Sequence, residues 1–168
     1  AIGQNALGTG ILTGNRNIAI GLNAAADLTS GTYNVIMGLH AASNATTATN
    51  TVAIGSSAIG AGVLTGTSNV AIGRQAGYDL TSGEHNFFSG FQAGYNATTP
   101  KYTIAIGYGA IGLGILTGDN NIVFGKQAGD DLTSGNNNFF AGFNAGRNAT
   151  TASNSVAIGN YAMGLGVN

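Results

Sequence analysis

The chain has 168 residues, enough for one domain with a substantial core. Only 7% of the residues are charged and the formal net charge is −1, so the basic surface needed for nucleic-acid binding is missing. Cysteine is absent, which excludes disulfides and thiolate metal sites. The most apolar window, residues 102–116, is interrupted by glycine and is shorter than the roughly 18 residues of a membrane-spanning helix, so we expect no membrane insertion by this segment.

A 52-residue repeat organises the chain, and glycine is its clearest marker. The glycines that close copies of a motif such as NVAIGRQAG (residues 69–77) recur at intervals of 18, 17 and 17 along the chain, and this series occurs three times. The DLTSG segments at Asp27, Asp79 and Asp131 have the same long period. We therefore predict ten short coils, one for each marker glycine. The marker glycines are Gly3, Gly21, Gly38, Gly55, Gly73, Gly90, Gly107, Gly125, Gly142 and Gly159.

The repeat predicts one continuous segment over residues 1–168. Its super-repeats span about 3–54, 55–106 and 107–158, and a partial fourth covers 159–168. Both ends stop within a coil and carry no polar capping unit, which solenoids need for solubility. We therefore expect this segment to be a fragment of a longer chain, or to stack on neighbouring copies as a filament.

Each coil carries one short apolar segment just before its glycine. β-branched residues dominate these segments, which favours strands over helices. The first and third residues of a segment share one face, which we expect to point into the core. Parallel stacking of one strand per coil predicts an all-β parallel β-solenoid, or β-roll. In chain order the segments are 18–20, 35–37, 52–54, 70–72, 87–89, 104–106, 122–124, 139–141 and 156–158.

The middle residue of each segment points to the opposite face and is never polar. Strands that are apolar on both faces are usually buried on both faces. We therefore predict that this column faces sister chains in a homotrimer around one axis. The trimer-facing residues would be Ala19, Ile36, Ala53, Ala71, Phe88, Ala105, Val123, Phe140 and Ala157.

The remaining coil positions predict corners. An alanine lies three residues after every marker glycine, as Ala76 does after Gly73, where only a small side chain should fit. An asparagine, threonine or serine opens each strand, and side chains such as that of Asn86 are expected to hydrogen-bond the turn and stack from coil to coil. The LTG, LTSG and NATT segments should form a second corner, with glycine where a positive φ is needed.

The pattern N/S-V-A-I-G-x-x-A resembles the head repeats of YadA-type trimeric autotransporter adhesins and the NTAIGYNAG-type repeats of phage tail fibres. Residues 155–162 (SVAIGNYA) are the closest copy, and the resemblance covers essentially the whole chain. It implies a trimeric β-roll outside the cell, in a phage tail fibre or a bacterial surface adhesin, joined to flanking fibre domains. Its function would be reach and display, with contact to a host glycan or protein receptor. Adhesin heads have a shorter repeat than the coils of this chain, which favours the fibre relatives.

No enzymatic site is predicted, and no catalytic, cofactor-binding or metal-binding residue is assigned. The GTG, GAG and GLG segments at residues 8–10, 60–62 and 112–114 do not complete a GxGxxG loop. Asp27, Asp79 and Asp131 occupy one repeat position three coils apart, too distant for paired-carboxylate catalysis. Surface contact with a ligand is assigned only to four aromatic residues, and for the two phenylalanines among them core packing is the preferred alternative. The four residues are Phe91, Phe143, Tyr78 and Tyr95.

Two further interpretations belong to other classes of function. A threonine in each coil, such as Thr65 and Thr117, would form a column suited to an ice-binding surface. The N-A-T sequences at Asn44, Asn96 and Asn148 would accept glycans in a eukaryotic secreted protein and would be turn residues in a bacterial or phage protein, which we prefer.

Overall fold

The computed structural model describes residues 1–8 and 12–163. Residues 9–11 and 164–168 lie outside the described residues. They include Ile11 of the first ILTG segment, most of the first GTG segment and the end of the partial fourth super-repeat. All strands in the described part are equally short. The strands are β1 (Ile18–Ile20), β2 (Val35–Met37), β3 (Val52–Ile54), β4 (Val70–Ile72), β5 (Phe87–Ser89), β6 (Ile104–Ile106), β7 (Ile122–Phe124), β8 (Phe139–Ala141) and β9 (Val156–Ile158).

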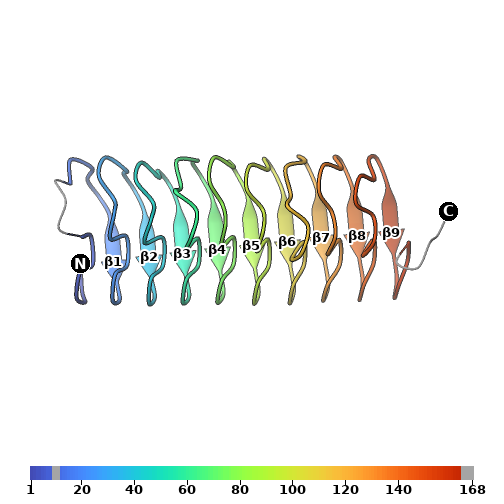
Figure 1. Cartoon of the computed structure of the whole chain (residues 1–168), viewed down its shortest axis with the longest axis horizontal. Coiled ribbons are helices and arrows are strands. Elements are labelled where there is room, and N and C mark those ends of the chain that lie inside the picture. Colours follow the sequence, from blue (N-terminus) through green and yellow to red (C-terminus); the bar gives the residue numbers. More distant parts are fainter. Residues whose placement is uncertain (9–11, 164–168) are drawn as a thin grey trace.

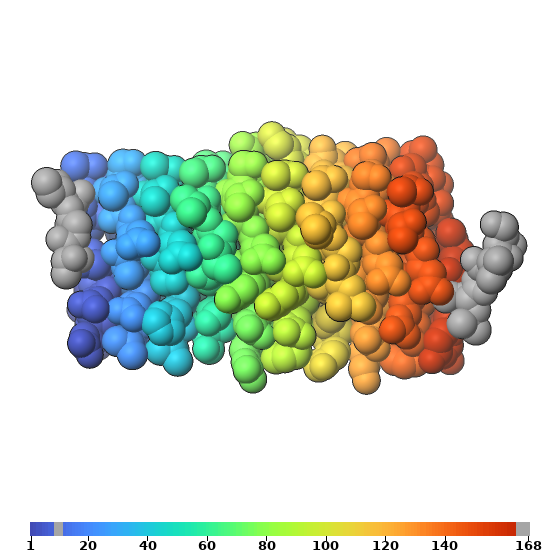
Figure 2. Space-filling view, viewed as in Figure 1, coloured from blue at the N-terminus to red at the C-terminus, as the bar shows by residue number. Residues whose placement is uncertain are grey.

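The strands form one parallel sheet in the order of the sequence, from β1 to β9. Equivalent residues pair directly, so that Ile18 pairs with Val35 and Val35 pairs with Val52. Each step is one coil, and Figure 1 shows the coils side by side along a rod, with β1 toward one end and β9 toward the other. In Figure 2 each coil contributes one band across the surface. The predicted all-β parallel β-solenoid with one strand per coil is confirmed, with about eight turns between β1 and β9.

The strands face the opposite way from the prediction. The middle residues, which we expected to face sister chains, are at most 3% exposed within the single chain and form part of its own core. The first and third residues, which we expected in the core, point outward and are half-buried or exposed. The assignment of a trimer-facing column to the middle residues is therefore wrong. The corrected residues are Ala19, Ile36, Ala53, Ala71, Phe88, Ala105, Val123, Phe140 and Ala157.

The physical reason is the narrow interior of a coil. The middle strand residue shares it with the alanine three residues after the marker glycine and with the residue after that alanine. In most coils the volumes of the middle strand residue and of the residue after the alanine are complementary: Phe88 is combined with Gly94, whereas Ala53 is combined with Ile59. A Cβ added to Gly94 would lie 2.8 Å from Cδ1 of Phe88. The interior therefore has room for one strand side chain per coil, with the opposite position adjusted to its size.

The two corners need glycine for different reasons. At the marker glycines φ lies between 122° and 138°, and a Cβ on Gly73 would lie 2.5 Å from the carbonyl oxygen of Gly90. At the second corner the expectation of a positive φ is wrong, since Gly66 and Gly83 do not have one. A Cβ on Gly66 would lie 1.9 Å from the carbonyl oxygen of Gly83 in the next coil. There glycine permits the close approach of adjacent backbones.

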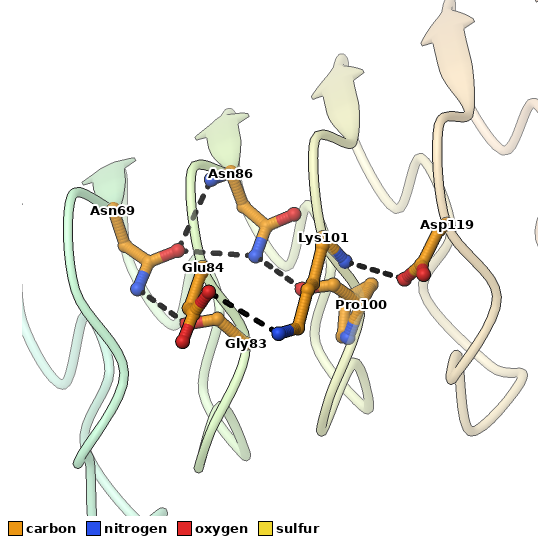
Figure 3. Close-up of polar contacts among 7 residues, drawn as sticks. All are labelled: Asn69, Gly83, Glu84, Asn86, Pro100, Lys101 and Asp119. Carbon is orange, nitrogen blue, oxygen red and sulfur yellow. Dashed lines mark hydrogen bonds and ion pairs between the residues drawn. The ribbon is translucent and has the colours of Figure 1, made fainter.

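The residues that open the strands form a buried hydrogen-bonded ladder, as predicted (Figure 3). Asn86 Nδ2 donates to Asn69 Oδ1 at 3.0 Å and to the carbonyl oxygen of Pro100 at 2.7 Å. Asn86 Oδ1 accepts from the backbone N–H of Thr103 at 3.0 Å. One side chain thus connects three successive coils. The predicted small residue at the first corner is also confirmed, since Ala76 and its equivalents from Ala24 to Ala145 are fully buried.

Candidate functional site

The outward surface of the sheet is a continuous apolar feature that runs along the described part of the chain. We call it the sheet face and define it as the first and third residues of β1 to β9. Every one of these positions is apolar except Ser89 in β5. Several of the side chains are exposed, including Ile72 at 38%. Continuous exposed apolar strips are typical of interaction surfaces in proteins.

An aromatic and cationic column borders the sheet face, one residue after each of the five consecutive marker glycines from Gly73 to Gly142. It contains two of the predicted contact residues, Phe91 and Phe143. Phe91 stacks on Tyr108 with ring centroids 5.1 Å apart. Lys126 Nζ lies 5.5 Å from the Tyr108 ring and 5.7 Å from the Phe143 ring, within the range of a cation–π contact. Arg74 lies over Phe91 in the same way. The column is a solvent-facing stack, and sequence reasoning missed the part that Tyr108 and Lys126 play in it.

The other two predicted contact residues, Tyr78 and Tyr95, lie in a separate column farther along the coil. Their rings are parallel within 3° and their centroids are 4.9 Å apart. Burial raises the pKa of the Tyr95 hydroxyl, and the neighbouring Tyr78 and Asp79 add to this shift. The four predicted residues therefore do not form one site, because Phe91 and Phe143 belong to one column and Tyr78 and Tyr95 to another.

A notch interrupts the tyrosine column beside Tyr95. It has a volume of about 340 Å³. Its floor is formed by Gly109 and Gly112, two positions of one coil that carry no side chain. Its walls belong to the coils before and after, and Tyr108 and Leu113 lie at its edges. The wall residues are Gln92, Tyr95, Asn96, Gln127 and Asp130.

Asp130 is the most unusual residue of the notch. It is only 2% exposed, and its Oδ2 atom is buried without a hydrogen-bond partner among the described residues. Arg147 Nε lies 3.8 Å from that oxygen. Burial raises the pKa of the Asp130 carboxyl and the charge of Asp131 adds to the shift, whereas Arg147 and the backbone N–H groups of Gly112 and Leu113 oppose it. The result is a partly compensated carboxylate that keeps one acceptor oxygen unused.

Sequence reasoning missed the notch, although the repeat contains a signal for it. Gly109 occupies the position held by Gln92 and Gln127 in the adjacent coils, and Gly112 occupies that of Tyr95 and Asp130. Two missing side chains in a single coil indicate a hollow in the surface.

The threonine column and the N-A-T sequences contribute to the turns. Thr29 Oγ1 donates to the carbonyl oxygen of Thr46 at 3.0 Å, and Thr133 Oγ1 donates to that of Thr150 at 2.8 Å. Asn44 Nδ2 and Asn96 Nδ2 donate to carbonyl oxygens of the next coil at 3.0 Å and 2.8 Å. These contacts occupy donors that ice or glycan chemistry would otherwise use, and they favour a structural role for both series.

The remaining polar residues are dispersed. Among residues 1–8 and 12–163, no group of three or more histidine and acidic side chains is placed to hold a metal ion. His85 stacks on Tyr102, with ring centroids 5.1 Å apart, and His40 Nδ1 lies 3.3 Å from Asn23 Nδ2. The described part of the chain also contains no helix with the length and apolar character needed to cross a membrane.

Comparison of the chain with models of protein families, with curated proteins and with solved structures gave no match.

Proposed function

We propose that this chain is a structural and adhesive segment of an extracellular fibre, either a phage tail fibre or a bacterial surface adhesin. In this fibre three copies pack around one axis and bury their sheet faces. The observation that carries the proposal is the sheet face itself, because a nine-stranded apolar strip is unfavourable in water. The sequence resemblance to trimeric fibre repeats supports the choice of three chains.

A second copy of the same chain is the partner that fits this surface best. The sheet face repeats at the spacing of parallel strands, about 4.8 Å, along all nine strands. A partner must offer apolar side chains at the same spacing over the same length, and another copy of this solenoid does so automatically. The ladder also extends beyond β1, since Ile2 forms a parallel bridge with Ile20. This bridge supports the proposed count of ten coils, with the first ending at Gly3.

The proposed function is mechanical. Each coil bonds only to its neighbours, so the rod transmits load along its axis through the stacked backbone and the asparagine ladder. Exposed turns such as the Phe91–Tyr108 stack remain outside the sheet face and are available for contact with a host surface.

The first prediction concerns the mass of the particle in solution. The wild-type chain should form a trimer of about 50 kDa, three times the 16.6 kDa of one chain, measured by light scattering after size-exclusion chromatography. Ile72→Asp, in the sheet face, should dissociate the trimer, because three carboxylates would be desolvated close together.

Val63→Asp is the matched control. Val63 is a similarly exposed aliphatic residue, at 53%, but it lies at the second corner and outside the sheet face. This variant should remain trimeric. A wild-type monomer would contradict the self-association, and a dimer would contradict the three-fold arrangement.

A further inference from the structure

The notch beside Tyr95 is a vacant position in a stack of rings. Tyr78 and Tyr95 occupy equivalent positions in adjacent coils and stack at 4.9 Å, close to the spacing of the coils. The next position along this column is Gly112, which has no side chain. The second face of the Tyr95 ring is therefore directed toward the notch, where a ligand ring can continue the stack.

A second column is interrupted in the same coil. Gln92 Nε2 donates to Gln75 Oε1 at 3.2 Å, and the amide column would continue through Gly109 to Gln127. A Cβ added to Gly109 would meet only Cγ of Gln127, at 3.5 Å, so this position is open. At Gly112 the Asp130 carboxylate lies close to the vacant position, since a Cβ there would lie 3.1 Å from Asp130 Oδ1. The notch has a volume of about 340 Å³, at the lower end of the range for small-molecule sites.

The walls offer hydrogen bonds in the pattern that hydroxyl groups require. Asp130 Oδ2 is a buried acceptor without a hydrogen-bond partner within the described residues. The Gln127 side chain likewise has no hydrogen bond inside the described chain, so that its amide can both donate and accept. Asn96 uses Nδ2 for the carbonyl oxygen of Leu113 and keeps Oδ1 as an acceptor.

The charges around the notch do not favour an anion. Asp130 and Asp131 contribute two carboxylates, and Asp79 is close enough to Tyr95 to raise the pKa of its hydroxyl. Arg147 lies 3.8 Å from Asp130, and Lys126 lies over the ring of Tyr108 at the notch edge. Three carboxylates thus stand against two cations, which leaves a neutral ligand or a cation, and the test below separates these two.

The repeat provides an internal comparison. One super-repeat earlier, Gly60 is equivalent to Gly112, but Ser57 stands in place of Gly109 and Tyr78 in place of Asp130. The open floor and the buried carboxylate therefore occur together only in the third super-repeat. A requirement of the fold would be expected in every super-repeat.

We propose that this notch binds a neutral hexopyranose, which stacks on Tyr95, donates a hydroxyl hydrogen bond to Asp130, and both donates to and accepts from the Gln127 amide. Aromatic faces match the C–H surface of a sugar ring, and the carboxylate and amides match its hydroxyls. The inference rests on the proposed function only for the biological use of the site, as the receptor contact of the fibre. The notch includes no sheet-face residue, so sugar binding and oligomeric state can be measured separately.

The test is titration of the purified chain with the methyl α-pyranosides of glucose, mannose and galactose, observed through the tyrosine signals in NMR spectra. At least one of them should bind with a Kd on the order of 1 mM, as expected for a ligand of this size. Gly109→Gln should weaken binding at least about tenfold, because it restores the amide column and fills the notch. Gln92 and Gln127 already occupy this position with positive φ, so the variant should fold normally.

Ser57→Gln is the matched control, since it places the same side chain at the equivalent position one super-repeat away, and it should leave binding unchanged. Asp130→Asn should weaken binding while the thermal unfolding transition stays cooperative. Failure of all three pyranosides to bind at about 50 mM would overturn the proposal. So would binding that Gly109→Gln leaves intact, or a preference for tetramethylammonium over the sugars. The particle mass of each variant, measured in parallel, tests the proposed trimer separately from sugar binding.

Discussion

At the scale of single residues, the interior is specified by pairs of complementary volume. Phe88 faces Gly94, and a Cβ on Gly94 would lie 2.8 Å from the Phe88 ring. In another coil of the chain the two sizes are exchanged, since the small Ala53 is combined with the large Ile59. The pair, rather than either residue, therefore determines whether the coil is filled.

This pairing predicts a rescue. Phe88→Ala should lower the free energy of unfolding by about 3–5 kcal/mol, because it leaves a cavity. Gly94→Ile alone should also destabilise the protein, since it collides with the Phe88 ring. The double variant should recover more than about 1 kcal/mol of the summed losses, because it reproduces the pair of Ala53 and Ile59. Urea unfolding of the four proteins measures the coupling, and additive losses would contradict the reciprocal packing.

Asp130 predicts a dependence of stability on pH. Burial raises its pKa above the ordinary value of 3.8 in the folded chain. Between that value and the raised one, the folded state binds the proton more readily than the unfolded state, so acidification favours folding at this residue. Relative to Asp130→Asn, the wild type should therefore gain stability as the pH falls from about 7 to below about 4. Urea unfolding of both proteins across this range tests it, and a constant difference between them would contradict the sign.

At the scale of the strand and its turns, the periodicity predicted the element and its register but not its direction. Alternation shows that Val70 and Ile72 share one face and Ala71 the other, and both faces are apolar. In so short a strand the choice of the inner face depends on the turns. The positive φ of Gly73 and the close packing around Ala76 leave room inside for one strand side chain.

The sequence nevertheless contains the information that was needed. In most coils the middle position and the residue four places after the marker glycine vary inversely in size, as in Ala105 with Ile111 and Phe140 with Gly146, although Ala71 is combined with Gly77. Only residues that share one cavity need such compensation. The notch could have been found by the same comparison of columns, whereas the unused Oδ2 of Asp130 depends on side-chain geometry that a one-dimensional pattern does not contain.

At the scale of the whole molecule, the solenoid is a one-dimensional array. Each strand pairs only with the strands before and after it, and each coil bonds to its immediate neighbours through the backbone and the asparagine ladder. Stability should therefore be close to a sum of contributions from coils and from contacts between adjacent coils. The unit that can be removed without changing those contacts is the 52-residue super-repeat.

Deletion of residues 55–106 tests this description. It joins Ile54 to Gly107, which is the equivalent of Gly55, so the turn is preserved. Ile111 then takes the place of Ile59 beside Ala53, so the interior of the coil stays filled. The shortened chain should keep a cooperative unfolding transition, with an m-value in urea lower by about a third because proportionally less surface is exposed. Deletion of residues 55–97 is the control. It connects Ile54 to Thr98, removes the marker glycine and its turn, and places the following strands out of phase with the preceding coil. If both deletions unfolded alike, long-range contacts across the rod would have to hold the structure together. If only the in-phase deletion stays folded, contacts between adjacent coils are sufficient, and the length of such a fibre can change by whole super-repeats without redesign of its core.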